Sequence, residues 1–285
     1  KYYHVNDGSI VSMPFEFSLE GGLFYDDSRE LPGERYYQYC TAIPVGTLLA
    51  QTWNRELIRE VGAMIGTEME HFGVTLWLAP GMNIHRNPLC GRNFEYYSED
   101  PYVSGTIAAA MTEGVQSNYG CGTTIKHFAC NNQETRRNRN DSRVSERALR
   151  EIYLKGFEIA IRESAPLAIM TSYNKVNGVW SHYHYELATQ ILRQEWGYQG
   201  LVITDWWMQE SDSPEFPQLR NDAYRIRAQV DVLMPGEIGK KNDPKAHTLV
   251  DSLADPDGVT LAEAQRCAGN VLRFILKIEG ARKNE

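Results

Sequence analysis

Five short and strongly apolar runs are spaced along the chain, and they constrain its fold more than any other feature. They are VTLWLAP (74–80), GTTIKHF (122–128), PLAIMTSY (166–173), GLVITDWW (200–207) and VDVLMPG (230–236). A strand with one face in water alternates apolar and polar residues, whereas runs as apolar as these are typical of strands buried on both faces. Parallel sheets covered by helices have this property, so the runs predict an α/β fold with parallel strands.

Amphipathic segments between and after the runs predict helices with recognisable ends. Asn54 is placed to cap a helix that closes near Gly73. A second helix is expected over 149–160 from its apolar spacing. A third is expected from Thr260, which forms a capping box with the glutamate three positions on, to about Ile278.

Strands that alternate with helices over this length are typical of barrel folds. We therefore predict a TIM-like (β/α)8 barrel over residues 41–285, with an irregular or incomplete N-terminal part. The first 50 residues are the least regular part of the chain, and we expect residues 1–40 to be an irregular N-terminal segment or a domain junction.

Composition excludes several classes of partner. The chain has 37 Asp and Glu against 29 Lys and Arg, a net charge of -8, and no basic run, so nucleic acid is not expected as a partner. No apolar run is long enough for a membrane span, so no membrane partner is expected either. The five cysteines form no CxxC pair and no zinc-like spacing, and reduced thiols in a cytoplasmic protein are the expectation, with an extracellular location left open.

Polar or aromatic residues follow or end each of the first four runs. Because the carboxyl ends of parallel barrel strands meet at one mouth, four segments are expected to deliver these side chains to one site. The residues are Asn83, His85, Arg86, Lys126, His127, Ser172, Tyr173, Asn174, Asp205 and Trp206.

Asp205 is the residue whose position points most directly to chemistry. It follows an apolar run and precedes Trp206 and Trp207. One interpretation is that Asp205 caps a following helix. The other is a carboxylate held among apolar and aromatic neighbours, as a glycosidase nucleophile requires. The tryptophans fit either a core or faces that stack on sugar C–H surfaces.

The basic residues also have two interpretations each. His127 fits a buried core histidine and Lys126 a buried ion-pair member, or both fit a ligand site. Arg92 is placed to pair with Glu95, Glu99 or Asp100 and hold a loop, but its forked guanidinium also suits two adjacent sugar hydroxyls.

Taken together, four segments resemble the motif series of glycoside hydrolase family 3 in order and spacing. They are NIHRNPLCGRNFEYYSEDP, IKHFACNNQETRRNRNDSRVSERALREIYLKGFE, IMTSYNKVNG and GLVITDWW. The resemblance implies a barrel catalytic domain of a retaining β-glycosidase of the β-glucosidase type. It also extends to 41–73 and to the C-terminal part, whereas the first 40 residues match poorly.

The resemblance implies a role for individual positions. Asp205 becomes the nucleophile, with Trp206 beside it, and Arg136 or Arg137 supplies a flanking charge. The family grips two hydroxyls with an aspartate in an Asp-Gly pair, for which Asp7-Gly8 and Glu20-Gly21 are the incomplete matches here, Glu20 in the better context. The expected substrate-binding residues are Arg92, Lys126, His127, Tyr173, Met170, Trp206 and Glu20.

One departure inside the motifs separates branches of the family. N-acetylglucosaminidases carry an acid/base histidine in a glycine-rich run after the Lys-His pair, whereas this chain reads KHFACNNQET. It therefore resembles the glucosidase branch, in which a glutamate from a second α/β domain is the acid/base. The expected partners are that second domain and a β-glucoside or oligosaccharide, with no metal and no organic cofactor. A β-xylosidase, and a carbohydrate-binding module without turnover, remain the alternatives.

Overall fold

The computed structural model describes residues 12–18, 22–24, 36–206, 208, 223–234, 249–256 and 258–282. The chain divides into two compact units, Lys1–Val45 and Gly46–Glu285. In the first unit, three strands form an antiparallel sheet in the order β2-β1-β3. They are β1 (Ser12–Ser18), β2 (Gly22–Phe24) and β3 (Tyr36–Tyr39).

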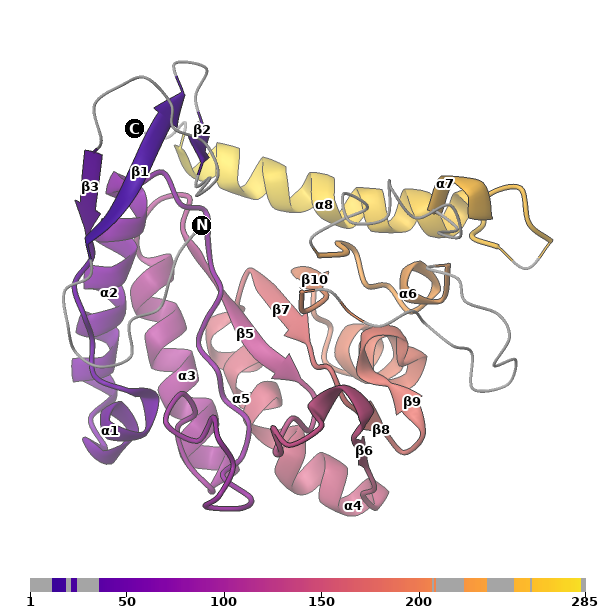
Figure 1. Cartoon of the computed structure of the whole chain (residues 1–285), viewed down its shortest axis with the longest axis horizontal. Helices are drawn as coiled ribbons and strands as arrows, with labels where there is room; N and C mark the ends of the chain where they lie inside the picture. The colour runs from indigo at the N-terminus through magenta and orange to yellow at the C-terminus, as the bar shows by residue number, and fades with distance from the viewer. Residues whose placement is uncertain are drawn as a thin grey trace. The chain divides into compact units, whose positions relative to one another are not determined.

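A parallel sheet organises the second unit, and its strands run in the order β10-β7-β5-β4 (Figure 1). The strands are β4 (Leu76–Trp77), β5 (Gly122–Phe128), β7 (Ala168–Thr171) and β10 (Leu201–Ile203). Every residue of β5, β7 and β10 is buried, as expected for a sheet that is covered on both faces. The predicted α/β fold with parallel strands is therefore confirmed.

Two isolated bridges add to the sheet over the described residues. Val232 bridges to Ile203 beyond the edge strand β10, and Gly81 bridges to Lys126 farther along β5, in the chain segment that follows β4. The fifth apolar run, 230–236, thus contributes one bridge rather than a strand over its described residues. Across the described residues the sheet does not close on itself; the prediction of a (β/α)8 barrel allowed for an irregular or incomplete N-terminal part.

Helices cover one face of the sheet, and a long helix packs against residues of the other. On the first face lie α2 (Arg55–His71), α3 (Pro101–Gln116) and α5 (Lys155–Ser164) (Figure 1). From the other side, Val271 and Phe274 of α8 (Leu261–Arg282) pack on a cluster that contains Met170 and Ile203. None of the helices in the described part of the chain is long and apolar enough to cross a membrane.

Two predicted helix ends are confirmed by their caps. The Asn54 side chain accepts hydrogen bonds from the backbone N–H groups of Glu56 and Leu57, both at 3.1 Å. At the start of α8, Thr260 and Glu263 bond reciprocally, with Thr260 N to Glu263 Oε2 at 2.9 Å and Glu263 N to Thr260 Oγ1 at 3.2 Å. The helix continues four residues beyond the expected end.

The helix expected over 149–160 is not continuous. It consists of α4 (Glu146–Ala148), the π-helical turn η2 (Leu149–Tyr153) and α5. The remaining elements connect these parts of the second unit. They are α1 (Gly46–Gln51), η1 (Arg137–Arg139), β6 (Asp141–Ser142), β8 (Lys175–Val176), β9 (Val179–Trp180), η3 (Ser181–Tyr183), η4 (Glu186–Glu195), α6 (Ala223–Arg227) and α7 (Leu249–Ser252).

Helix α3 was not anticipated because it has no polar face to create a period. Asp100 caps it, Pro101 opens it, and most of its residues are buried between α2 and α5. Glycines set the spacing of α2 and α3. A methyl group on Gly114 would collide with the carbonyl oxygen of Arg59, and one on Gly62 with that of Met111.

We therefore expect Gly114→Ala to destabilise the fold by about 1–3 kcal/mol through overpacking, measured by chemical denaturation. The matched control is Gly269→Ala in α8, where the nearest atom to the added methyl is Arg273 Nη1 at 4.0 Å. This variant should gain roughly 0.5–1 kcal/mol from helix propensity. Equal effects at the two positions would contradict the close approach of α2 and α3.

Candidate active site

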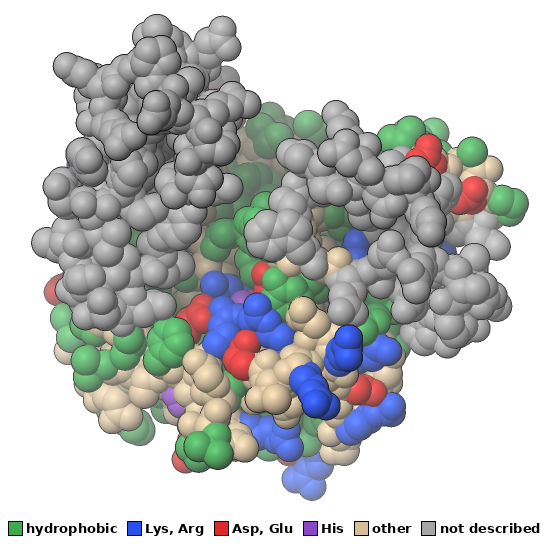
Figure 2. All heavy atoms as spheres, in the orientation of Figure 1, with side chains coloured by type: hydrophobic (Ala, Val, Ile, Leu, Met, Phe, Trp, Pro, Cys, Tyr) green, Lys and Arg blue, Asp and Glu red, His purple; other side chains and the backbone are tan. Residues whose placement is uncertain are grey.

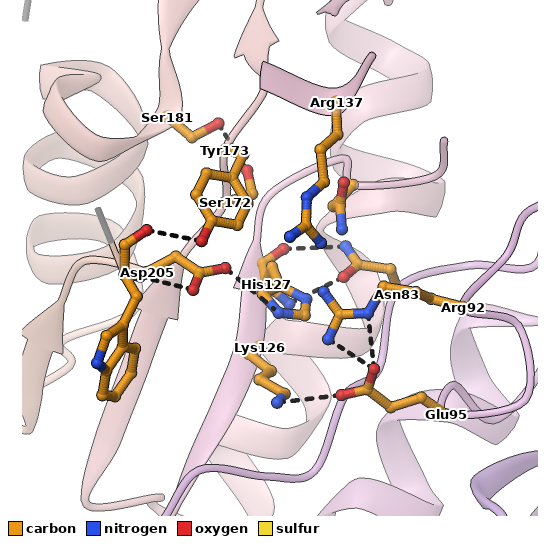
Figure 3. A network of polar contacts seen from close by, with 12 residues as sticks. Asn83, Arg92, Glu95, Lys126, His127, Arg137, Ser172, Tyr173, Ser181 and Asp205 are labelled. Carbon is orange, nitrogen blue, oxygen red and sulfur yellow. Dashed lines mark hydrogen bonds and ion pairs between the residues drawn. The ribbon is translucent and has the colours of Figure 1, made fainter. Parts of the chain in front are cut away.

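The carboxyl ends of β5, β7 and β10 converge on one polar cluster (Figure 3). Lys126 and His127 lie on β5, and Tyr173 and Asp205 lie just beyond the ends of β7 and β10. Acidic, basic and histidine side chains gather near the centre of the face of the molecule that Figure 2 shows. The structure thus brings together residues that are separated by up to 79 positions, as the parallel arrangement predicts.

Asp205 is buried, with 8% of its surface exposed. Its Oδ1 accepts a hydrogen bond from the Trp206 N–H at 2.7 Å, and its Oδ2 lies 3.7 Å from His127 Nε2. Burial raises the pKa of the carboxyl above its ordinary value, and the Trp206 N–H and the charge of Lys126 offset this only in part. The segment on which a helix-capping role would depend lies outside the described residues.

His127 is held by contacts on its backbone and its ring. The backbone N–H donates to Asn83 Oδ1 at 2.8 Å, and the carbonyl accepts from Asn83 Nδ2 at 2.9 Å. The ring Nδ1 lies 3.1 Å from the Tyr96 hydroxyl. Burial, reinforced by the positive charges of Arg92 and Lys126, lowers the pKa of His127 well below its ordinary value. The imidazole is therefore neutral near pH 7.

Glu95 ties Arg92 to Lys126. Its Oε2 accepts from Arg92 Nη2 at 2.6 Å, and its Oε1 lies 3.0 Å from Lys126 Nζ. Burial acts to raise the pKa of Glu95, but Lys126 and Arg92 together lower it below the ordinary value. Of the three carboxylates considered from the sequence as partners of Arg92, Glu95 is the one that pairs with it.

Tyr173 and Arg137 form the side of the cluster next to β7. The Tyr173 hydroxyl donates to the carbonyl oxygen of Trp206 at 2.6 Å, and the Arg137 guanidinium stacks 4.4 Å from the centre of the Tyr173 ring. Burial and the negative charge of Asp205 raise the pKa of Tyr173, so the phenol stays protonated. Arg137 also pairs with Glu134 at 2.8 Å.

The remaining predicted site residues have different positions. Met170 belongs to the buried cluster that α8 packs on, and Trp206 packs against the same cluster. Arg136 adopts a left-handed backbone conformation and lines an open hollow of about 460 Å³ with Glu134 and Arg137. Glu20 and the alternative Asp7 lie outside the described residues, so their contacts stay predictions.

The sequence did not predict two buried residues next to His127 as members of the site. Tyr96 is fully buried, and Asn131, 1% exposed, donates to its hydroxyl at 3.1 Å. Their only sequence signal is position inside the segments that carry the family motifs, because both contacts join residues more than 30 positions apart. Among the residues that the structure describes, no three His, Cys, Asp or Glu side chains converge as a metal site requires.

This arrangement has the chemical features of a sugar-processing site. It places one buried carboxylate beside a neutral histidine, a lysine, an arginine and an aromatic side chain. Charged and neutral donors of this kind suit vicinal hydroxyls, and the carboxylate suits attack on a carbon that develops positive charge.

Comparison with known proteins identifies the family. Residues 27–267 match the model of the glycosyl hydrolase family 3 N terminal domain. The chain belongs to this family. A β-glucosidase of Ruminococcus albus is 50% identical over 238 residues, which are 82% of this chain and 24% of the relative. The family assignment agrees with the resemblance carried by the four motif segments.

Other relatives have related names. An exo-α-(1->6)-L-arabinopyranosidase of Bifidobacterium longum is 43% identical over 75% of this chain and 30% of its own length. The solved structure of β-glucosidase 3B from Thermotoga neapolitana in complex with glycerol has a TM-score of 0.79 and 43% identity, and the match covers 92% of this chain and 35% of that one. The chain thus spans about a quarter to a third of these family 3 relatives.

The raised pKa of Asp205 predicts an effect on stability. Because folding raises this pKa, the folded state binds the proton more tightly than the unfolded state, and the ionised carboxylate costs stability at every pH above its folded pKa. The cost vanishes below the ordinary value of about 3.9. Asp205→Asn should therefore raise the Tm at pH 7, and the gain should shrink as the pH falls towards 4.

The control is Glu60→Gln on the exposed surface of α2, which also removes one negative charge. It should change stability by less than about 0.5 kcal/mol at every pH. A lower Tm for Asp205→Asn than for the unaltered chain at pH 7 would show that the cations hold the carboxylate in place for stability.

Proposed function

We propose that this chain is the nucleophile-bearing barrel domain of a retaining, exo-acting β-glycosidase that removes terminal β-linked glucose. The observation that carries the proposal is the buried carboxylate of Asp205, 3.7 Å from His127 Nε2 and within the field of Lys126 and Arg92. The names of the relatives from Ruminococcus albus and Thermotoga neapolitana support glucose as the sugar.

In the proposed first step, a carboxylate oxygen of Asp205 attacks the anomeric carbon. The bond from that carbon to the leaving oxygen breaks, and an acid protonates the leaving oxygen. Lys126, Arg92 and His127 bind the hydroxyls of the glycone, and Tyr173 holds the backbone next to the nucleophile through Trp206. Met170 and Trp206 form part of the wall of the pocket.

In the second step, water attacks the anomeric carbon of the glycosyl-enzyme. The conjugate base of the acid takes the proton from the water, and Asp205 leaves as a carboxylate. A retaining enzyme needs the second carboxyl group roughly 5–5.5 Å from the first. We assign this acid/base to a second domain, because the two nearby glutamates, Glu95 and Glu134, are both in ion pairs with arginine.

A pentose-acting hydrolase is the second candidate. The Bifidobacterium longum relative, named for release of L-arabinopyranose, favours it at 43% identity. A xyloside differs from the glucoside by the missing hydroxymethyl group, and an L-arabinopyranoside differs also in the configuration of one ring hydroxyl. Paired kcat/KM values on aryl glucoside, xyloside and arabinopyranoside therefore decide between the two. We also propose a cytoplasmic location, which rests on the reduced thiols expected from the cysteine pattern.

Labelling with a 2-deoxy-2-fluoro glucoside that carries a good leaving group tests the nucleophile. We expect the chain to gain the mass of one fluoro-sugar at Asp205, located by peptide mass spectrometry. Asp205→Asn should take up none, because an amide is a far weaker nucleophile than a carboxylate. Glucose binding without any labelling would indicate a binding module instead, and labelling at another carboxylate would overturn the assignment.

Azide tests where the acid/base resides. If it lies in a second domain, the isolated chain should turn over cellobiose poorly but still react with aryl glucosides whose leaving groups need little protonation. Its glycosyl-enzyme should then decay slowly, and azide, which needs no base, should accelerate that decay and yield glucosyl azide. Full turnover of cellobiose without azide would show that the acid/base lies within these 285 residues.

A further inference from the structure

A buried hydrogen-bonded chain leads from the surface to the ring of His127. Glu134 Oε1 accepts from Asn131 Nδ2 at 3.0 Å, and the same amide nitrogen donates to the Tyr96 hydroxyl at 3.1 Å. The Tyr96 hydroxyl in turn lies 3.1 Å from His127 Nδ1. Both central members, Tyr96 and Asn131, are almost completely buried, so water does not compete for these contacts.

The direction of each hydrogen bond follows from the chemistry of its ends. The Glu134 carboxylate, which also accepts from Arg137, has no proton to give, so Asn131 must turn its NH₂ group towards it. The second hydrogen of that NH₂ group points at the Tyr96 oxygen. Tyr96 therefore accepts from Asn131, and its own single hydrogen is left for His127 Nδ1.

We propose that Tyr96 is a positioning residue that fixes His127 in the neutral tautomer with its hydrogen on Nε2. A neutral imidazole carries one N–H, and an Nδ1 that accepts from Tyr96 leaves the hydrogen on the other nitrogen. Nε2 faces Asp205 Oδ2 at 3.7 Å, beyond direct hydrogen-bond distance. The N–H is thus presented to the space beside the nucleophile.

The other tautomer would reverse the polarity of the site. With the hydrogen on Nδ1, the ring would turn a lone pair towards the Asp205 carboxylate, and the Tyr96 O–H would lose its acceptor inside the core. A sugar hydroxyl at this position would then have to donate to the histidine rather than accept from it. The role in sugar binding rests on the proposed function, but the tautomer itself does not.

The experiment is ¹⁵N–¹H correlation NMR on the whole chain labelled at histidine nitrogens, at pH 7. Two-bond couplings distinguish the two neutral tautomers and the imidazolium, and a His127→Asn variant assigns the signal. We expect His127 as the Nε2–H tautomer in the unaltered chain, and a mixture of both tautomers in Tyr96→Phe. Tyr97→Phe removes the hydroxyl of the adjacent tyrosine, also buried, and should leave the tautomer unchanged.

Glucose affinity gives the second readout. Tyr96→Phe should weaken binding roughly two- to tenfold, as loss of one well-oriented hydrogen bond predicts, while Tyr97→Phe should not. An Nδ1–H or imidazolium form in the unaltered chain would overturn the proposal, as would a pure Nε2–H form in Tyr96→Phe. The spectra need no turnover, so they decide the tautomer even if the chain proves inactive on glucosides.

A further variant covers the case in which Tyr96→Phe does not fold. Glu134→Gln places an amide that can donate to Asn131 Oδ1, which lets the hydrogen-bonded chain reverse. We then expect some Nδ1–H tautomer at His127. An unchanged signal would show that Glu134 does not set the direction.

Discussion

Burial of the Asp205 carboxylate is the constraint on which the rest of the site depends. Removal of a carboxylate from water costs several kcal/mol, and a neutral histidine at 3.7 Å cannot offset this by charge. The offset comes from the Trp206 N–H and from the positive charges of Lys126, Arg92 and Arg137. The pKa that remains raised shows that the offset is incomplete, which leaves the carboxylate less stabilised than in water.

A second set of acidic residues forms ion pairs with these cations. Glu95 lies between Arg92 and Lys126, and Glu134 pairs with Arg137. Each positively charged group near Asp205 is thereby paired with a glutamate. Glu134 also orients Asn131, so one acidic residue serves both the cation and the hydrogen-bonded chain to His127.

The sequence predicted the strands well because their environment leaves a simple pattern. The run 122–128 coincides with β5 from end to end, since a strand buried on both faces is apolar throughout. The sequence did not predict helix α3 for the same reason, because a helix buried on all sides has no amphipathic period. Asp205, His127 and Tyr173 could be grouped because the carboxyl ends of parallel strands meet. Their contacts could not be foreseen. Successive side chains of a regular strand point to opposite faces, yet Lys126 and His127 both contact the site, where the register of β5 against β7 shifts between Lys126 and Phe128. Tyr96 and Asn131 meet only in the tertiary structure.

The electrostatics of the site also bear on where a proton donor is best placed. The positive charges that keep Asp205 ionised would equally lower the pKa of any second carboxyl group close to them, as they do for Glu95. A general acid must instead keep its proton until the leaving oxygen needs it. A nucleophile and an acid on the same cation-rich wall would therefore have opposed requirements. A carboxyl group carried by a separate domain, which approaches from the side of the leaving group, avoids that conflict, because the glycone then separates it from Lys126 and Arg92. The charge distribution around Asp205 thus favours the proposal that the acid/base belongs to a second domain.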